Sequence, residues 1–112
     1  MTGIVERVLQ SSVRAQARSV DSVFKNLVEE VGELSRALNR PWRCDEPAIG
    51  EIADVINCVI DLAYMMEVES CARMGISEAD ISADKIQRHL ERWVDRKCDK
   101  WDRCENADPE AL

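Results

Sequence analysis

The segment from residue 48 to residue 66 constrains the fold most, because almost every side chain in it is apolar. Its apolar residues are Ile49, Ile52, Val55, Ile56, Val59, Ile60, Leu62, Met65 and Met66. At helical spacing these side chains cover most of the circumference of a helix. A helix that is hydrophobic nearly all round is expected in the middle of a domain, with other elements packed around it.

The polar residues of this segment are not scattered. Glu51, Asp54, Asn57 and Asp61 occupy one arc of roughly 120° on the same helical wheel. A carboxylate taken out of water is destabilising unless it is paired or bound to a metal, and this helix supplies no cation before Arg73. The stripe therefore requires an open cleft or a cation. The alternative is a polar stripe that faces water or a second copy of the chain.

The rest of the chain also has helical periodicity, which predicts four helices with short connections. We expect a first helix over about residues 3–18, a second capped by Asp21 or Ser22 and ending near Asn39, a third capped by Asp45 and ending near Arg73, and a fourth running through Trp93 to Trp101. Gly75 is the expected stop of the third helix. Ser77, with Asp80, is the expected cap of the fourth. This pattern is typical of an all-α protein whose protomer resembles a four-helix bundle.

Aromatic side chains and one acidic residue give further structural expectations. Phe24, Tyr64, Trp93 and Trp101 are expected to serve packing and not base recognition. Asp61 is expected to accept a hydrogen bond from a partner helix, since it lies one turn past Asn57 on a mostly apolar helix.

Length and charge narrow the range of functions. The 112 residues suffice for one domain, expected over residues 1–104, followed at 105–112 by an acidic tail that is expected to be flexible. A domain this short gains from packing against a second copy. The net charge of −7, without a basic run, argues against nucleic acid and membranes as partners. A nucleotide is compatible with this charge, because a metal ion can bridge phosphate and carboxylate.

The lack of a recognisable secretory or membrane-spanning pattern, together with the cysteine usage, predicts a cytoplasmic protein. The N-terminal 18 residues lack a continuous apolar core, and the apolar stretch Val55–Met66 is interrupted and too short to span a bilayer. The five cysteines have no framework spacing, so we expect reduced thiols. A zinc site is not expected, since there is no Cys-x-x-Cys pair and His89 is the one histidine.

The predicted second helix carries the remaining acidic residues of interest. On a helical wheel Phe24, Leu27, Val31, Leu34 and Leu38 fall on one side, and Asn26, Glu29, Glu30 and Glu33 fall on the other. Taken alone, this is a surface helix with a solvated acidic face. Opposite Glu51 and Asp54, the same carboxylates would form a cluster of like charges that a divalent cation relieves. All-oxygen ligands favour a hard ion, Mg²⁺ or Mn²⁺.

These acidic residues also form a pair of motifs. Glu29-Glu30-x-x-Glu33 followed by Glu51-x-x-Asp54 resembles the signature of the MazG-like nucleotide pyrophosphohydrolases. The surrounding stretches, residues 27–34 and 50–55, are similar too, and the resemblance covers about residues 20–93.

The resemblance implies an all-α bundle that forms a homodimer or homotetramer around its active site. It implies Mg²⁺-dependent hydrolysis of an NTP or dNTP to the monophosphate and pyrophosphate. Glu30, Glu33, Glu51 and Asp54 would bind Mg²⁺, with Mn²⁺ as a substitute, and Glu29 and Glu30 would act in catalysis. Glu29 would hold a second metal or orient the attacking water. Bound Mg²⁺ suits this reaction because it neutralises phosphate charge and activates water.

The resemblance also points to substrate-binding residues on the fourth helix. The family often has Lys-x-x-x-Asn-x-x-Arg-Tyr there, close to the phosphates. In this chain Lys85 and Arg92 match, whereas His89 and Trp93 stand in place of Asn and Tyr. Lys85 and Arg92 can equally be ordinary surface charges.

Two more residues are candidates for recognising the nucleoside. Trp42, in the loop between the two acidic helices, could stack on a base. Asn57 could bind the sugar, the base or a metal-bound water, or it could make a hydrogen bond within the bundle.

Two other functions fit the same pattern. One keeps the reaction and changes the substrate to phosphoribosyl-ATP or a signalling nucleotide. The other is a non-catalytic helical interaction module whose acidic groove meets a basic partner. A di-iron carboxylate bundle is rejected, because it needs Glu-x-x-His motifs and Ile86 stands three residues before His89.

Overall fold

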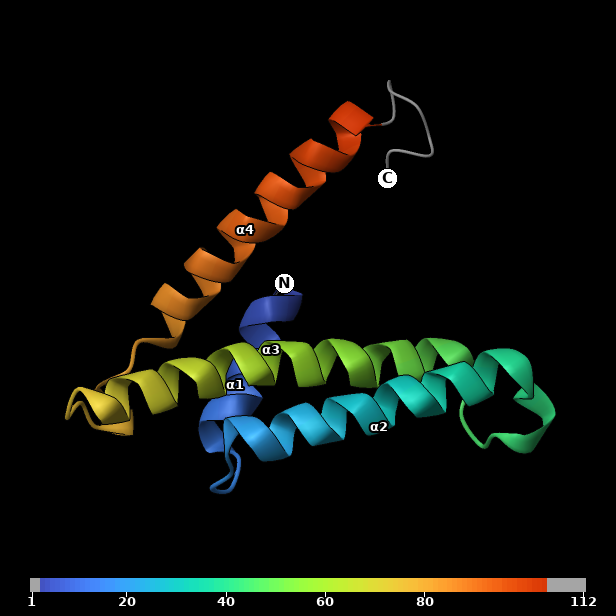
Figure 1. Cartoon of the computed structure of the whole chain (residues 1–112), viewed down its shortest axis with the longest axis horizontal. Helices are drawn as coiled ribbons and strands as arrows, with labels where there is room; N and C mark the ends of the chain where they lie inside the picture. The colour runs from blue at the N-terminus through green and yellow to red at the C-terminus, as the bar shows by residue number, and fades with distance from the viewer. Residues whose placement is uncertain (1–2, 105–112) are drawn as a thin grey trace.

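The computed structural model describes residues 3–104, which form four α-helices and two short 3₁₀ helices without a strand (Figure 1). In chain order the elements are α1 (Ile4–Arg14), α2 (Val20–Asn39), η1 (Pro41–Arg43), α3 (Ala48–Arg73), η2 (Glu78–Asp80) and α4 (Ala83–Cys104). The predicted all-α class is confirmed. The tail expected at 105–112 lies outside the described residues. No described helix combines the length and apolar character needed to cross a membrane.

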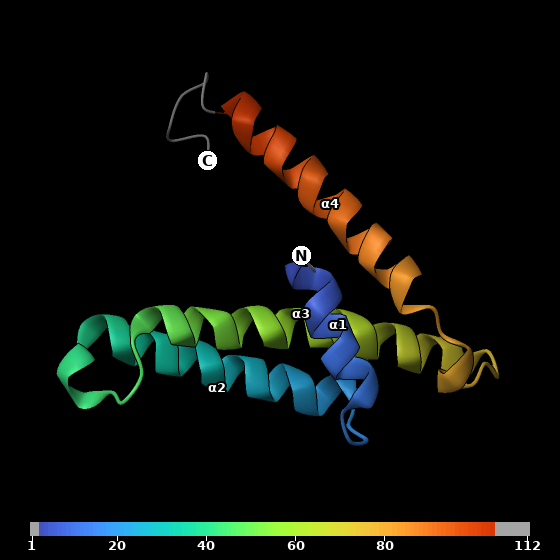
Figure 2. The same cartoon turned by 180° about the vertical axis from the view of Figure 1, so that it is seen from behind.

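Helices α2 and α3 form an antiparallel hairpin and lie side by side in both views (Figures 1 and 2). Two hydrogen bonds mark its register. Near one end the Val20 amide donates to the Glu69 carboxylate, and further along the Asn26 side-chain amide donates to Cys58 Sγ at 3.6 Å. This register places the next turn of α2, which carries Glu30, opposite the turn of α3 that carries Asp54.

The hydrophobic core lies where α1 and the start of α4 pack against α3. Its buried residues are Leu9, Val23, Ile60, Tyr64, Met65 and Ile86. Helix α3 contacts α1, α2, α4 and η2, as expected for a central helix. It is not enclosed, however, because Ile49 is 70% exposed and Met66 is 57% exposed. Helix α3 therefore carries more apolar surface than the single chain buries.

The packing face of α2 differs from the expected one. Val23 and Ala37 are buried, and Glu30, seven residues from each, lies on the same stripe and is half-buried. Phe24 and Leu38, on the predicted apolar side, are more than half exposed. Phe24 was expected to pack, and this is wrong for the single chain. Helix α3 contacts the stripe of α2 that carries Val23, Glu30 and Ala37, and not the more hydrophobic stripe next to it.

Helix α4 projects from the body as an arm (Figures 1 and 2). Every residue from Glu91 to Arg103 is exposed, so Trp93 and Trp101, which were expected to serve packing, are exposed in the single chain. Tyr64 is buried as expected. The radius of gyration is 16.6 Å, above the about 13 Å of a compact domain of this length. The single chain is thus not a closed four-helix bundle.

The caps of α2 and α3 are not the predicted ones. Ser19 caps α2 in place of Asp21 or Ser22: its hydroxyl accepts from the Ser22 amide, and the Ser22 hydroxyl accepts from the Ser19 amide. This reciprocal pair satisfies two backbone donors that a helix start would otherwise leave open. Helix α3 follows Pro47, whose side chain makes no capping bond, and not Asp45.

In the connection from α3 to α4, α3 ends at the predicted glycine, whereas α4 begins later than predicted. Gly75 has a φ of +76°, and the Ile76 amide donates to the Cys71 carbonyl, which is the expected glycine stop. Ser77 accepts from the Ala79 amide and so begins η2. The Ser82 hydroxyl accepts from the Lys85 amide at the start of α4, so the predicted cap of α4 at Ser77 is wrong.

Arg18 explains why α1 ends at Arg14 and not near residue 18. Its guanidinium donates to the Ser12 carbonyl at 3.0 Å and to the Asp61 carboxylate at 2.9 Å. The two side chains are only 15% and 21% exposed. Burial opposes the ionisation of Asp61, but the Arg18 guanidinium holds the pKa of Asp61 below its ordinary value. Asp61 therefore accepts a hydrogen bond as predicted, from the α1–α2 connection.

The Arg18→Ala variant should lower the free energy of unfolding by about 2 kcal/mol, because it leaves a largely buried carboxylate without its partner. Urea denaturation followed by circular dichroism measures this loss. Because the pKa of Asp61 is lowered, the stabilisation is present above its unfolded pKa. It should fade below about pH 4 as Asp61 gains a proton.

The matched control is Lys25→Ala, which breaks an ion pair with Asp21 whose side chains are 73% and 76% exposed. That variant should cost less than about 0.5 kcal/mol. Equal losses for the two variants would contradict the role assigned to Arg18.

Candidate metal centre

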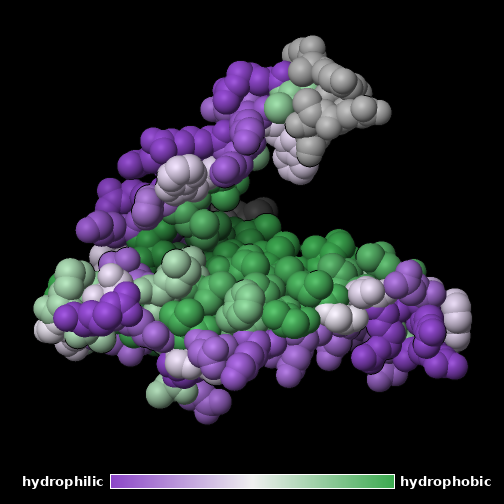
Figure 3. Space-filling model, viewed as in Figure 1, coloured by the Kyte–Doolittle hydropathy of each residue, from purple (hydrophilic) through white to green (hydrophobic). Residues whose placement is uncertain are grey.

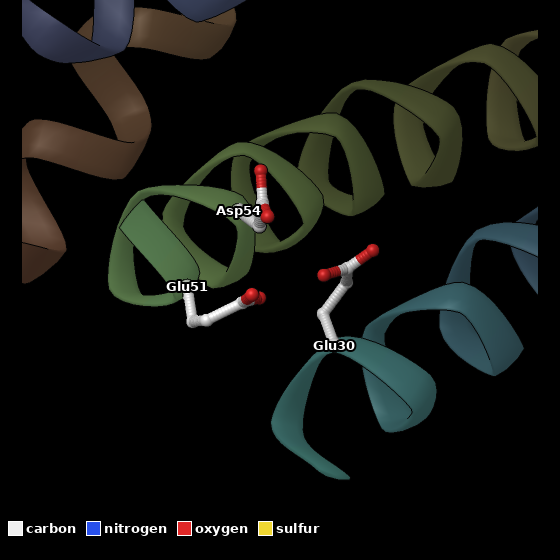
Figure 4. A group of neighbouring side chains, drawn as sticks. All are labelled: Glu30, Glu51 and Asp54. Carbon is white, nitrogen blue, oxygen red and sulfur yellow. The ribbon is translucent and has the colours of Figure 1, made fainter. Parts of the chain in front are cut away.

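Three carboxylates from α2 and α3 converge in the gap between these helices. Glu30 comes from α2, and Glu51 and Asp54 come from successive turns of α3 (Figure 4). One oxygen from each side chain lies within 4.8 Å of the others. Oxygens around one Mg²⁺ stand at most about 4.2 Å apart, twice the ligand distance. The spacing of the three oxygens is therefore close to that of ligands around a single ion.

Two of these carboxylates each have one buried oxygen without a hydrogen-bond donor. Glu51 is 8% exposed, and Oε2 of both Glu30 and Glu51 is buried and accepts no hydrogen bond from a described residue. An unsatisfied buried acceptor is destabilising, and native structures hold few of them. A cation in the gap would satisfy both oxygens at once.

The electrostatics of the group point the same way. The ion pairs of the described chain all lie elsewhere, so no lysine or arginine neutralises these three carboxylates. Burial, followed by the nearby charge of Glu33, raises the pKa of Glu30 and the pKa of Glu51. Both side chains therefore hold a proton more readily than a solvated glutamate, and a bound cation would compete with that proton.

The polar stripe of α3 is resolved into three different environments. At its far end Asp61 is neutralised by Arg18, so the protein supplies the cation there. In the middle Asn57 is exposed. At the near end Glu51 and Asp54 face Glu30 without a protein cation. Along this stripe, the end with Glu51 and Asp54 is therefore the part that could hold a metal ion.

The other two predicted acidic residues lie beside the group. Glu33 is exposed, one turn after Glu30 on α2, and close enough for its charge to act on both Glu30 and Glu51. Glu29 is exposed. The structure thus brings together three of the four predicted metal ligands and places Glu33 at the margin.

The predicted substrate residues are spread over the molecule. Trp42 lies in η1 and is 76% exposed. Lys85 lines a cleft of about 1030 Å³ between α4 and the C-terminal half of α3, where Cys71 also lies. Cys71 follows Asp54 by seventeen residues, or about 25 Å along the helix. Arg92 is exposed on the arm. Within one chain, neither cation reaches the carboxylate group.

The structure also reveals neighbours that sequence reasoning did not single out. A pocket of about 450 Å³ between α1, α2 and α3 is lined by Arg7, Asn26, Asn57 and Cys58, among others. Asn26 precedes Glu30 by one turn, and Cys58 follows Asp54 by one turn. That four-residue spacing was the available signal for Asn26 and Cys58. The position of Arg7 depends on how α1 crosses the hairpin, which no local pattern shows.

Comparison with known proteins adds no family to this description. No family model, no curated protein and no solved structure matches the chain. What the structure defines is an all-α protein with a group of two glutamates and one aspartate that could hold a metal ion.

The Glu51→Gln variant should raise the melting temperature of the metal-free protein by a few degrees near neutral pH, since it removes a buried charge crowded by like charges. A raised pKa means that the folded state binds a proton more tightly than the unfolded state. Stability is therefore lost as pH rises from 4.5 through the raised value. Thermal scans in mildly acidic and neutral buffer should show a weaker loss for the variant.

Glu91→Gln is the matched control, because Glu91 is exposed on α4 and its partner is Gln87. It should leave both the melting temperature and its pH dependence unchanged. A lower melting temperature for Glu51→Gln would mean that the Glu51 carboxylate is stabilising, against the argument above.

Proposed function

We propose that the protein is a Mg²⁺-dependent nucleoside triphosphate pyrophosphohydrolase, which cleaves an NTP or dNTP to the monophosphate and pyrophosphate. The observation that carries this proposal is the buried Glu51 carboxylate, which lies beside Asp54 and faces Glu30 across the hairpin, with no cation of the described residues to pair it. The same residues stand at the motif positions that resemble the MazG-like signature.

Under this proposal the carboxylates hold the ion and leave positions for phosphate and water. Glu30, Glu51 and Asp54 supply the ligands, and Glu33 joins them after a rotation from its exposed position. Mg²⁺, when bound, would neutralise phosphate oxygens and activate a water. By the resemblance, Glu30 would also act in catalysis beside its role as a ligand. Glu29, exposed one residue earlier, would orient the water or hold a second ion.

The charge of the site indicates how substrate would arrive. A free triphosphate would be repelled by the carboxylates, which no described cation neutralises. A magnesium–nucleotide complex carries less negative charge and delivers the ion with the phosphates. This favours substrates that bind Mg²⁺ through adjacent phosphates, as nucleoside triphosphates do.

The working form under this proposal is a homo-oligomer. Apolar side chains stay exposed along the hairpin, on α2 at Phe24, Val28, Val31 and Leu38 and on α3 at Ile49, Ile52, Val59 and Met66. Figure 3 shows apolar residues gathered over the body beneath the arm. Exposed apolar surface of this extent favours a protein partner.

Charge makes a second copy the best partner. The segment from Val20 to Arg73 has eleven acidic residues and five lysines and arginines, whereas α4 has five acidic residues and seven lysines and arginines. On α4 the side chains of Lys85, Arg92, Arg96 and Arg103 share one edge, at intervals of seven, four and seven residues. An arm of one copy beside the body of another would bring these cations toward the phosphates, which one chain does not do.

The main test is pyrophosphate release from a full panel of NTPs and dNTPs with Mg²⁺. At least one nucleotide should be cleaved, and Glu33→Gln or Asp54→Asn should reduce the rate by at least about a hundredfold, as loss of a metal ligand does. Asp95→Asn, on the exposed arm, is the control and should keep full activity. Full activity of both ligand variants would refute the site.

Including phosphoribosyl-ATP and signalling nucleotides in the panel separates the proposed substrate class from the alternatives. Thermal scans with Mg²⁺ separate an enzyme from an interaction module, since an ion bound by the folded state raises the melting temperature. An absence of both cleavage and a Mg²⁺-dependent rise would favour the module.

Sedimentation velocity tests the oligomer. The native chain should sediment as a dimer or tetramer, and a variant with Phe24→Lys and Val59→Lys should sediment as a monomer, because both changes place charge on the exposed hairpin surface. Ile4→Lys, at an even more exposed apolar position on α1, is the control and should not change the assembly. A monomeric native chain at micromolar concentration would refute self-association.

A further inference from the structure

We propose that the pocket between α1, α2 and α3 binds the nucleobase, and that the side-chain amides of Asn26 and Asn57 contact the edge of the base. The inference rests on the proposed function, because it places the nucleoside end of a nucleotide whose phosphates would lie at the carboxylates. The pocket holds about 450 Å³. That volume falls within the roughly 300–1,000 Å³ of small-molecule sites.

The pocket lies about one helical turn from the carboxylate group on both helices of the hairpin. Asn26 precedes Glu30 by one turn of α2, and Asn57 follows Asp54 by one turn of α3. These steps are about 6 Å on α2 and about 4.5 Å on α3 along the helix axis. Such distances suit a single sugar between a base in the pocket and a phosphate at the carboxylates. The two helices therefore present amides first and carboxylates next, along the same gap.

The charge of the pocket differs from that of the neighbouring carboxylates. Its acidic residue, Asp61, is neutralised by Arg18, and its other charged residue is Arg7, which donates to Ser11 at 2.7 Å. The pocket is therefore not an anionic site. Its remaining charge is that of Arg7, so it does not repel the nucleoside end of a ligand whose other end is anionic.

The amides give the pocket its chemical selectivity. Each carboxamide carries both a donor and an acceptor in one plane, which matches the paired donors and acceptors on a base edge. Asn26 uses one amide hydrogen on Cys58 Sγ and keeps its carbonyl oxygen for a ligand. The Asn57 side chain makes no hydrogen bond with another described residue. Val8 and Ala15 add an apolar wall for the flat face of the ring.

The test uses uncharged nucleosides, which need no metal. The ¹⁵N-labelled full chain, kept free of divalent ions, is titrated with adenosine, guanosine, cytidine, uridine and thymidine, and with ribose as a ligand without a base. The side-chain amide signals of Asn26 and Asn57 should shift with at least one nucleoside and not with ribose. The amide of Asn39 is an internal control, because it bonds Ser35 at the opposite end of α2.

Single substitutions then test the contacts themselves. Asn57→Leu and Asn26→Leu should each weaken binding of the preferred nucleoside by roughly tenfold, the effect of losing one amide–base contact. Asn39→Leu should leave it unchanged. Asn57 and Asn26 are both exposed, so an unchanged backbone spectrum will show that the variants fold. The inference is overturned if no nucleoside shifts the two amides, if Asn39 shifts equally, or if both variants bind like the native chain.

This result and the enzymatic result can fail independently. Nucleoside binding at these amides without any pyrophosphate release would refute the pyrophosphohydrolase and keep the pocket. Cleavage of nucleotides without any nucleoside-dependent shift at Asn26 and Asn57 would refute the pocket and keep the enzyme.

Discussion

The antiparallel packing of α2 on α3 brings carboxylates from both helices into one gap. The like charges of these carboxylates repel one another, and other interactions in the fold have to offset that repulsion. Glu51 is almost fully buried beside Glu30 and Asp54, with Glu33 adding charge from the margin. The far half of the hairpin supplies the compensation, through the Arg18 ion pair and the core around Tyr64. A chain that keeps an unfavourable group of charges inside a stable frame follows the pattern of functional sites, which trade stability for chemistry.

Helix α3 arranges three kinds of polar environment along one stripe. Unpaired carboxylates come first, an exposed amide follows at Asn57, and a neutralised aspartate closes the stripe at Asp61. Each differs in what it can bind, because a charge without a partner requires a cation and an amide requires hydrogen-bond partners. Carboxylates followed by an amide would suit a nucleotide whose phosphates lie at the metal group and whose base lies at Asn57, which links the two proposals to a single physical arrangement.

Sequence patterns predicted the all-α class, the end of α3 at Gly75 and the closeness of Glu30 to Glu51 and Asp54. These features depend on local periodicity and on the antiparallel pairing of helices that are neighbours in the sequence. The patterns failed for α2, because a helical wheel gives relative positions and not the stripe that meets a neighbour. The Arg18–Asp61 pair joins residues 43 apart in sequence, and no local pattern shows it. Nor does periodicity reveal that α4 projects from the body after Leu90. An amphipathic helix has the same sequence pattern whether its apolar face packs against its own chain or against another one.

The arm sharpens the question of how the site is completed. A motif alone would place Lys85 and Arg92 beside the phosphates, but in one chain Lys85 lies in the cleft with Cys71, about 25 Å along α3 from Asp54. Lys85 and Arg92 are either ordinary surface charges of the arm or cations that reach the carboxylates of another copy. The exposed apolar hairpin and the opposite charge balance of body and arm favour the second arrangement. Catalysis and assembly would then be one property of the chain, because the copy that buries the hairpin would also supply the missing positive charge.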